Sequence, residues 1–477
     1  MSGRSLWWGV LLLLVALSCS SQPPRPTTIA PAPAAATPAV RPAAPLSDQE
    51  ILRRLDLKFG THGDIAVPDG LPEDQLREAY RGFLRDRMKQ DAFYDSTLHA
   101  LKLIRGPGES PSMLPPLPFT LMKSETTPAF YYLDKPCAAS EQVVVAPWWN
   151  LGSKVRVCAD AYKPELASYV AGGGSTVWCD STFYKAHTAW VASPCKCGKN
   201  LMNCAPSGEV QRAIMKGFSD EQMLTVKHVV EGHLPFGEIL TLPGSVRSGY
   251  GDFFYARSEF IETGRWSYPN PEAPESIDAR LRPRPAAFDA GIVSTWFWMV
   301  DSDSYRVMAR ELWDQFLCHP LASRNVTPAE ILKAMGGSAT AVGKFRDSVR
   351  MEFTTAPGCQ DCHKILENAS RTMVGYTLMQ YGGHYIKDRA DPGTIQFYVD
   401  GVSAPRAEGP ATLHWLGATI AAQPEFTACM VKKVLDYIYD GFDYAPELAD
   451  RLQTRFSNGQ DFATLFEDAV VSRYLGR

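Results

Sequence analysis

The run Cys359-Gln360-Asp361-Cys362-His363 constrains this chain more than any other feature, because it spells CxxCH, the attachment signature of a c-type haem. Cysteines three positions apart present both sulfurs on one side of a helical turn, where they can form thioethers to the two vinyl groups of one porphyrin. His363 follows at once and can place its imidazole under the iron as the proximal ligand. The motif occurs once in the 477 residues, so the sequence predicts one covalent haem c.

Two other interpretations of this cysteine pair are a redox disulfide and half of a zinc site. A zinc site commonly needs a second Cys or His pair, and the chain has no second CxxC. A redox CxxC usually follows a strand of a βαβ unit, whereas residues Thr354–Gly358 are loop-like. The histidine directly after Cys362 therefore favours haem over both alternatives.

The N-terminus predicts export, which covalent haem attachment needs. Residues 1–18 carry the basic Arg4 and an apolar run that is too short for a comfortable membrane span. The run ends like a bacterial lipobox, with cleavage before Cys19 and lipidation of its sulfur, although Ala16 stands where that motif usually has Leu; an ordinary secretory signal is the alternative. Ser20 resembles the residue that follows the lipidated cysteine in outer-membrane lipoproteins. We therefore expect a periplasmic or cell-surface protein held to the membrane by a lipid anchor.

The composition after the signal predicts a tethered globular body. Residues 19–46 are rich in Pro and Ala and lack hydrophobic periodicity, which predicts a disordered tether. No later stretch approaches the ~20 apolar residues that a membrane span needs. The net charge of −4 becomes one unit more negative when Arg4 leaves with the signal, which excludes the basic footprint of a nucleic-acid-binding protein.

The remaining cysteines favour disulfides, because an exported protein meets an oxidising compartment. Apart from Cys19 and the haem pair there are eight, and their pairing is open: Cys137, Cys158, Cys179, Cys195, Cys197, Cys204, Cys318 and Cys429. A metal site around Cys195, Cys197 and Cys204, with Cys179 or His187 as a fourth ligand, is the less favoured alternative. His228 and His233 are not spaced as an i,i+4 metal pair and are expected to be ordinary histidines.

Hydrophobic periodicity predicts a mainly α fold with a small Cys-rich insertion that contains β-structure. Ser47 to Glu50 look like a capping box before the first helix. Runs at Gln142–Val145 and Lys154–Val157, with a turn at Asn150–Ser153, predict a hairpin. The helices expected are Glu73–Phe83, Phe93–Ile104, Ser219–Leu240 broken at Pro235, Ser304–Phe316, Lys364–Gln380, Phe426–Tyr439 and Phe462–Tyr474, with a loop over Asn270–Pro285.

These elements suggest four parts of the mature body, since ~430 residues exceed one ordinary core. We expect a helical module over 47–125, a Cys-rich insertion over 126–215, a second helical module over 216–350 and a cytochrome c-like haem module over 351–477.

Several patches resemble one family, the exported haem-c-bearing proteins of unknown function known as planctomycete-type cytochrome c proteins, which also occur as lipoproteins. The patches are Leu46–Leu55, Leu234–Thr241, Ala290–Thr295, Leu317-Cys318, the CxxCH run, the helix around Cys429 and Phe462–Leu475. Their order in the chain carries the resemblance. After His363 the family often reads DP-GF-lE-fD, whereas this chain has Glu367–Met373. The resemblance implies an architecture around one haem and gives no settled biochemical role.

The sixth iron ligand decides what such a haem does, because a second strong ligand makes an electron carrier and an open position permits substrate chemistry. Met379 and His384 flank the turn at Gly382-Gly383, so either can fold back over the porphyrin. Met373 lies about 15 Å from His363 along a straight helix and can reach only if that helix breaks. Met430, beside Cys429, is the last candidate, and our order is Met379, Met373, His384, Met430; for each methionine, core packing is the alternative.

We hypothesise that Cys318 and Cys429, which flank the haem segment, form a disulfide that closes the haem module. The favoured function is a membrane-tethered extracytoplasmic cytochrome c that passes single electrons to an unidentified redox partner, with no catalytic residues of its own. The alternatives are a haem-dependent oxidoreductase with an open iron site, and a surface binding lipoprotein in which the haem is structural or sensing.

Overall fold

A computed structural model describes residues 46–65, 67–68, 70–104, 119–162, 168–170, 176–178, 196–263, 273–284, 286–295, 298, 305–321, 360–374 and 391–476. Only the backbone is described for residues 168–170, 176–178, 215, 218–219, 257–263 and 360–362. The expected signal peptide and nearly all of the tether lie outside these ranges. So do Cys19, Cys179, His187, Cys195, Cys359, Met379 and His384.

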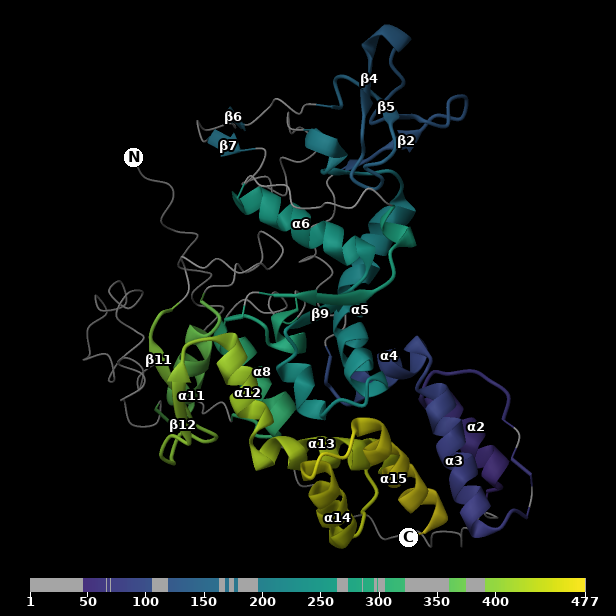
Figure 1. Ribbon diagram of the computed structural model, residues 1–477, viewed down its shortest axis with the longest axis vertical. Helices are drawn as coiled ribbons and strands as arrows, with labels where there is room; N and C mark the ends of the chain where they lie inside the picture. The colour runs from purple at the N-terminus through teal and green to yellow at the C-terminus, as the bar shows by residue number, and fades with distance from the viewer. Residues whose placement is uncertain are drawn as a thin grey trace, which may run out of the picture.

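The fold is mainly α with small sheets, as the periodicity predicts. Helices from the two ends of the chain lie together at the bottom of Figure 1. They are α2 (Asp48–Lys58), α3 (Glu73–Arg87), α4 (Asp91–Ala100), α13 (Pro424–Tyr439), α14 (Pro446–Ser457) and α15 (Phe462–Leu475). Phe59, Phe93 and Phe466 meet edge to face at the centre of this group, with ring centroids 5.3–5.6 Å apart.

Local sequence explains where these helices begin. Ser47 caps α2, since its Oγ accepts a hydrogen bond from the Glu50 amide at 3.3 Å. The expected capping box is only half formed, because the Glu50 carboxylate accepts from Arg53 and Arg54 instead. Asp461 caps α15 in the same way as Ser47 caps α2. Proline at the first position starts α13 and α14.

A long helix, α5 (Gly208–Glu231), connects this helical group to the upper part of the molecule (Figure 1). It begins eleven residues before the expected start at Ser219, because Ser207 caps it. Strands β9 (Gly244–Arg247) and β10 (Arg280–Pro283) pair with each other beside α5. Between them in the chain come α6 (Gly249–Thr263) and the 3-10 turn η6 (Pro274–Ser276). Strand β10 corrects the loop expected over Asn270–Pro285: its backbone pairs in register with β9, which the prolines did not indicate.

The Cys-rich segment forms a four-stranded sheet at the top of Figure 1, in the order β2-β3-β5-β4. Its strands are β2 (Met122–Lys123), β3 (Phe130–Tyr132), β4 (Gln142–Val145) and β5 (Val155–Cys158). Val143 pairs with Val157 across the antiparallel β4–β5 hairpin, which confirms the predicted hairpin. Smaller elements beside it are β1 (Phe119–Thr120), β6 (Ser168–Val170), β7 (Thr176–Trp178), β8 (Cys204–Ala205), η2 (Ala139–Glu141) and η4 (Lys199–Leu201).

The segment around CxxCH lies at the left of Figure 1, where α11 (Gln360–Arg371) packs on α8 (Tyr305–Leu317). Helix α11 ends at Arg371 and not at Gln380 as expected, and a turn over residues 372–374 follows it. The hairpin β11 (Thr394–Phe397) and β12 (Ala407–Pro410) flanks α11. The remaining elements are η5 (Phe236–Leu240), η7 (Gly291–Ser294) and α12 (Leu413–Ala421).

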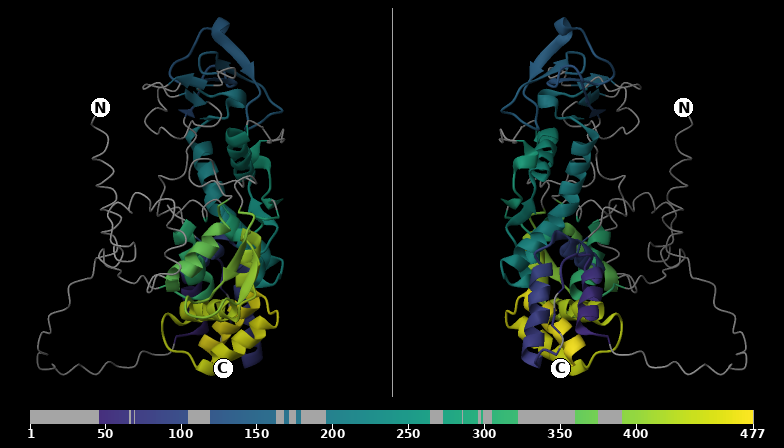
Figure 2. Two further views of the ribbon diagram at one scale, coloured as in Figure 1. Left: turned by 90° about the vertical axis from the view of Figure 1, so that its left-hand side faces the viewer. Right: turned by 90° about the vertical axis from the view of Figure 1, so that its right-hand side faces the viewer.

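The cores do not follow the four expected parts. One large core takes buried side chains from residues 52–104, 223–317, 365–399 and 413–471, so three of those parts share it. The four-stranded sheet has its own small core around Val157 and the cysteines. A third cluster, centred on Trp148 stacked on Phe253, joins the sheet region to α6. Figure 2 shows the resulting elongated shape, with the sheet and the C-terminal helices at opposite ends.

Candidate functional site

The CxxCH motif lies at the start of α11, whose first residue is Gln360. Only backbone is described for Cys362, and Cys359 lies just before the described residues. His363 is the first residue of the motif with a described side chain, and about a quarter of that side chain is exposed, at 24%. A half-buried imidazole can contact the protein interior on one side and a group bound at the surface of α11 on the other.

The imidazole of His363 is oriented by a carboxylate one helical turn further on. Its Nδ1 lies 3.3 Å from Oε1 of Glu367, and the same oxygen accepts a hydrogen bond from Nε of Arg306 at 2.6 Å. Arg306 comes from α8, so the contact ties two packed helices together. Glu367 itself is buried, with 9% of its surface exposed.

This carboxylate is ionised at neutral pH. Burial raises the pKa of Glu367, but the hydrogen bonds and charges of His363 and Arg306 outweigh burial, so its pKa lies below the ordinary value. An ionised carboxylate only accepts hydrogen bonds, and Nδ1 of His363 must therefore be the donor. In the neutral imidazole Nε2 then carries the lone pair, which is the atom and the tautomer that an iron ligand needs. The residues present thus fit a haem whose iron is bound by His363.

Helix α11 is held in place beyond this contact. Arg371 donates to Asp391 at 2.7 Å and to the Thr394 carbonyl at 2.8 Å. The side-chain oxygen of Asn368 accepts from the amide of Gln396 at 3.0 Å, which ties the helix to β11. These contacts of Glu367, Asn368 and Arg371 lie in the C-terminal half of the helix and limit how far α11 can shift.

The structure gives different surroundings to the distal-ligand candidates. Met373 follows the end of α11 in a turn and is fully buried in the large core. Met430 lies on α13 in the same core with 1% of its surface exposed. Both fit the core-packing alternative, although the helix break that Met373 needs is present after Arg371. Met379 and His384 lie outside the described residues.

Three cysteine pairs form disulfides among the described residues. Cys318 and Cys429 join α8 to α13 with an S–S distance of 2.08 Å, which is the pair hypothesised from the sequence. The others are Cys137–Cys158 and Cys197–Cys204. The last pair corrects the metal alternative for the CxC cluster, because a disulfide leaves neither Cys197 nor Cys204 a thiolate for a metal. Within the described ranges no group of three or more His, Cys, Asp or Glu could hold a metal ion.

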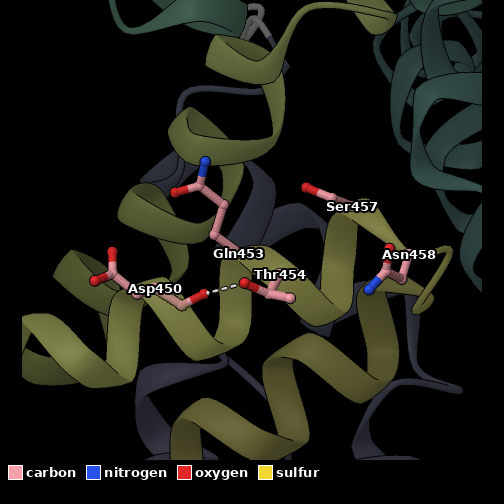
Figure 3. Close-up of a pocket in the computed structure, with 5 residues that line it drawn as sticks. All are labelled: Asp450, Gln453, Thr454, Ser457 and Asn458. Carbon is pink, nitrogen blue, oxygen red and sulfur yellow. Dashed lines mark hydrogen bonds between the residues drawn. The ribbon is translucent and has the colours of Figure 1, made fainter.

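Hollows in the described part of the chain lie away from α11. The first, of about 430 Å³, is lined by one helix, α14, and the residue after it; Thr454 donates to the Asp450 carbonyl within that helix (Figure 3). The second, of about 710 Å³, lies between α3, α4, the end of α5 and α15. Two of its acids are already bound by arginines: Arg85 donates to Glu467 at 3.0 Å and Arg455 to Asp468 at 3.0 Å. These charges hold α3 and α14 to α15, so they serve the packing of the helices.

Sequence reasoning found His363 and missed its two partners. The spacing of His363 and Glu367 is i,i+4, which places both on one helix face and is a usable signal. Arg306 is 57 positions before His363 and no local pattern links them. The described helices include none that is long and apolar enough to cross a membrane. No protein-family model, no curated protein and no solved structure matches this chain.

Proposed function

We propose that this chain is an exported, membrane-tethered c-type cytochrome that transfers single electrons through one covalently attached haem. The observation that carries the proposal is the CxxCH run whose histidine has Nδ1 held by the buried carboxylate of Glu367 at 3.3 Å. A redox CxxC leaves the histidine after Cys362 unexplained, and a zinc site commonly needs a second Cys or His pair, whereas the chain has no second CxxC. A covalent haem supplies the one-electron iron couple.

The surroundings of His363 support electron transfer. Helix α11 packs on α8 and is tied by hydrogen bonds of Asn368 and Arg371 in its C-terminal half, so we expect the histidine to move little between the two charge states of a bound iron. A rigid ligand keeps the reorganisation on electron transfer small. Disulfides such as Cys318–Cys429 are typical of proteins in oxidising compartments and agree with export.

Covalent attachment is tested by expressing the exported chain in cells that mature c-type cytochromes. We expect a haemochrome spectrum, and haem that stays with the chain on a denaturing gel. Cys359→Ala with Cys362→Ala must abolish the retained haem. The matched control is Cys197→Ala with Cys204→Ala, which removes the same number of sulfurs from a disulfide far from α11 and must leave haem attached. A wild-type chain without covalent haem refutes the proposal.

The distinction between carrier and enzyme depends on the sixth ligand. A reduced spectrum that carbon monoxide leaves unchanged supports a protein ligand on both faces and electron transfer. Rapid binding of carbon monoxide supports the haem-dependent oxidoreductase instead. Replacing Met373, Met379, His384 or Met430 by Ala one at a time identifies the ligand as the one whose loss opens the iron.

Tethering is a separate part of the proposal. Cys19→Ala prevents lipidation at that residue, and we expect it to move the exported protein from the membrane fraction to the soluble fraction. The haem spectrum of the released protein should not change, because Cys19 belongs to the anchor and not to the haem region. A protein that stays with the membrane after this substitution contradicts the lipid anchor.

A further inference from the structure

Glu367 sits between two cationic or proton-donating groups from different helices. Its Oε1 is 3.3 Å from Nδ1 of His363 and 2.6 Å from Nε of Arg306. The carboxylate is buried, while 39% of the Arg306 side chain is exposed. One oxygen atom is therefore shared by the histidine and the arginine.

We infer that Glu367 is a positioning residue that sets the redox potential of the iron through His363, and that Arg306 opposes it. The inference rests on the proposed function, since it assumes that His363 binds the haem iron. Glu367 acts through His363, the residue that would bind the iron.

The physical reason is the charge that reaches Nε2. A carboxylate that accepts a hydrogen bond from Nδ1–H draws the proton towards itself and makes the imidazole a stronger electron donor to the iron. A stronger donor stabilises ferric iron over ferrous iron and lowers the potential. Because Glu367 is buried, water screens this effect little.

Arg306 weakens the same effect. Its guanidinium binds Oε1 at the shorter distance, so part of the carboxylate charge is neutralised before it acts on Nδ1. Removing Arg306 should then leave Glu367 with its full effect on His363. The two side chains are expected to move the potential in opposite directions, and each should depend on the other.

The test measures the midpoint potential of the haem-loaded full chain. Glu367→Gln should raise it, Arg306→Gln should lower it, and Arg306→Gln should have little effect once Glu367 is already Gln. The matched control is Asp391→Asn, which removes another carboxylate that contacts α11, in this case through Arg371 at the far end of the helix from His363. The control distinguishes a change in midpoint potential that acts through His363 from a change caused by the loss of one negative charge near α11.

A second measurement does not depend on the potential. In the ferric protein the ring protons of the iron-bound histidine give strongly shifted NMR signals. Glu367→Gln should move these signals and speed the exchange of the Nδ1 proton with solvent, whereas Asp391→Asn should change neither.

The outcomes are distinct. A wild-type chain that retains no haem overturns the proposed function. A loaded chain in which Glu367→Gln and Asp391→Asn shift the potential equally, with the histidine signals unchanged, overturns the inference alone. Should Glu367→Gln fail to load haem, the Arg306→Gln variant still decides: a lower potential supports the inference and an unchanged one overturns it.

Discussion

The disulfide between Cys318 and Cys429 should stabilise this protein more than the one between Cys197 and Cys204. The reason is the length of chain that each closes: the sequence separations are 111 and 7 residues. A cross-link restricts the unfolded chain more when it closes a longer loop. The perturbation is the replacement of both cysteines of a pair by Ala.

The magnitude follows from the loop lengths. At 25 °C the chain-entropy relation gives about 4.8 kcal/mol for the 111-residue separation and about 2.4 kcal/mol for the 7-residue separation. Packing works against this order, since Cys197 and Cys204 are fully buried and their loss leaves more unfilled space. Cys137–Cys158, with a separation of 21 residues, should fall between them at about 3.3 kcal/mol.

The assay is urea unfolding of the three double variants and the wild type, followed by far-UV circular dichroism and tryptophan fluorescence. Coincident transitions show that one free energy of unfolding describes the whole chain. Unchanged slopes against urea show that the variants alter stability and not the surface exposed on unfolding. If the Cys318/Cys429 variant loses less stability than the Cys197/Cys204 variant, the loop-length reasoning is refuted.

Three further predictions concern substitutions of single residues. Burial lowers the pKa of Lys433 to about 8, whereas the unfolded chain keeps the ordinary lysine pKa of 10.5. Between these two pH values the unfolded chain binds more protons than the folded chain, so the free energy of unfolding should rise with pH. Lys433→Met should flatten that rise in thermal melts. Gly291→Ala should destabilise the protein strongly in the same melts, because φ of Gly291 is +51° and a Cβ there would lie 2.1 Å from a backbone oxygen. The control is Gly82→Ala, in an open helical position, which should stabilise the protein by about 1 kcal/mol. Arg87→Met should lower the free energy of unfolding in urea by about 3–5 kcal/mol, since it leaves the buried Asp56 carboxylate without the guanidinium that binds it at 2.6 Å. The control is Arg77→Met, which breaks an exposed pair with Glu73 and should lower it by under about 1 kcal/mol.

Local patterns predicted much of the secondary structure. Apolar residues at helical spacing placed α3, α8, α13 and α15, because a helix that packs on a core must present one apolar face. Alternation placed the β4–β5 hairpin. The pattern missed α12, α14 and the β11–β12 hairpin, and it mistook β10 for loop, since two prolines and four charged or polar positions around it hide a strand whose backbone pairs only with β9.

The sequence by itself contains the patterns on which the proposal rests: the CxxCH run at Cys359–His363 that predicts a haem, the N-terminal run that predicts export, and cysteines suited to an oxidising compartment. These patterns are made by residues that are neighbours in the chain, so the amino-acid sequence alone shows them.

Only the tertiary structure decided what surrounds that chemistry. Arg306 reaches Glu367 because α8 packs on α11, and Cys318 meets Cys429 because α8 packs on α13. The ends of the chain share one core for the same reason: α3 and α15 bury apolar faces against each other although ~380 residues separate them. Such contacts depend on the burial of whole faces, so no short stretch of sequence specifies them.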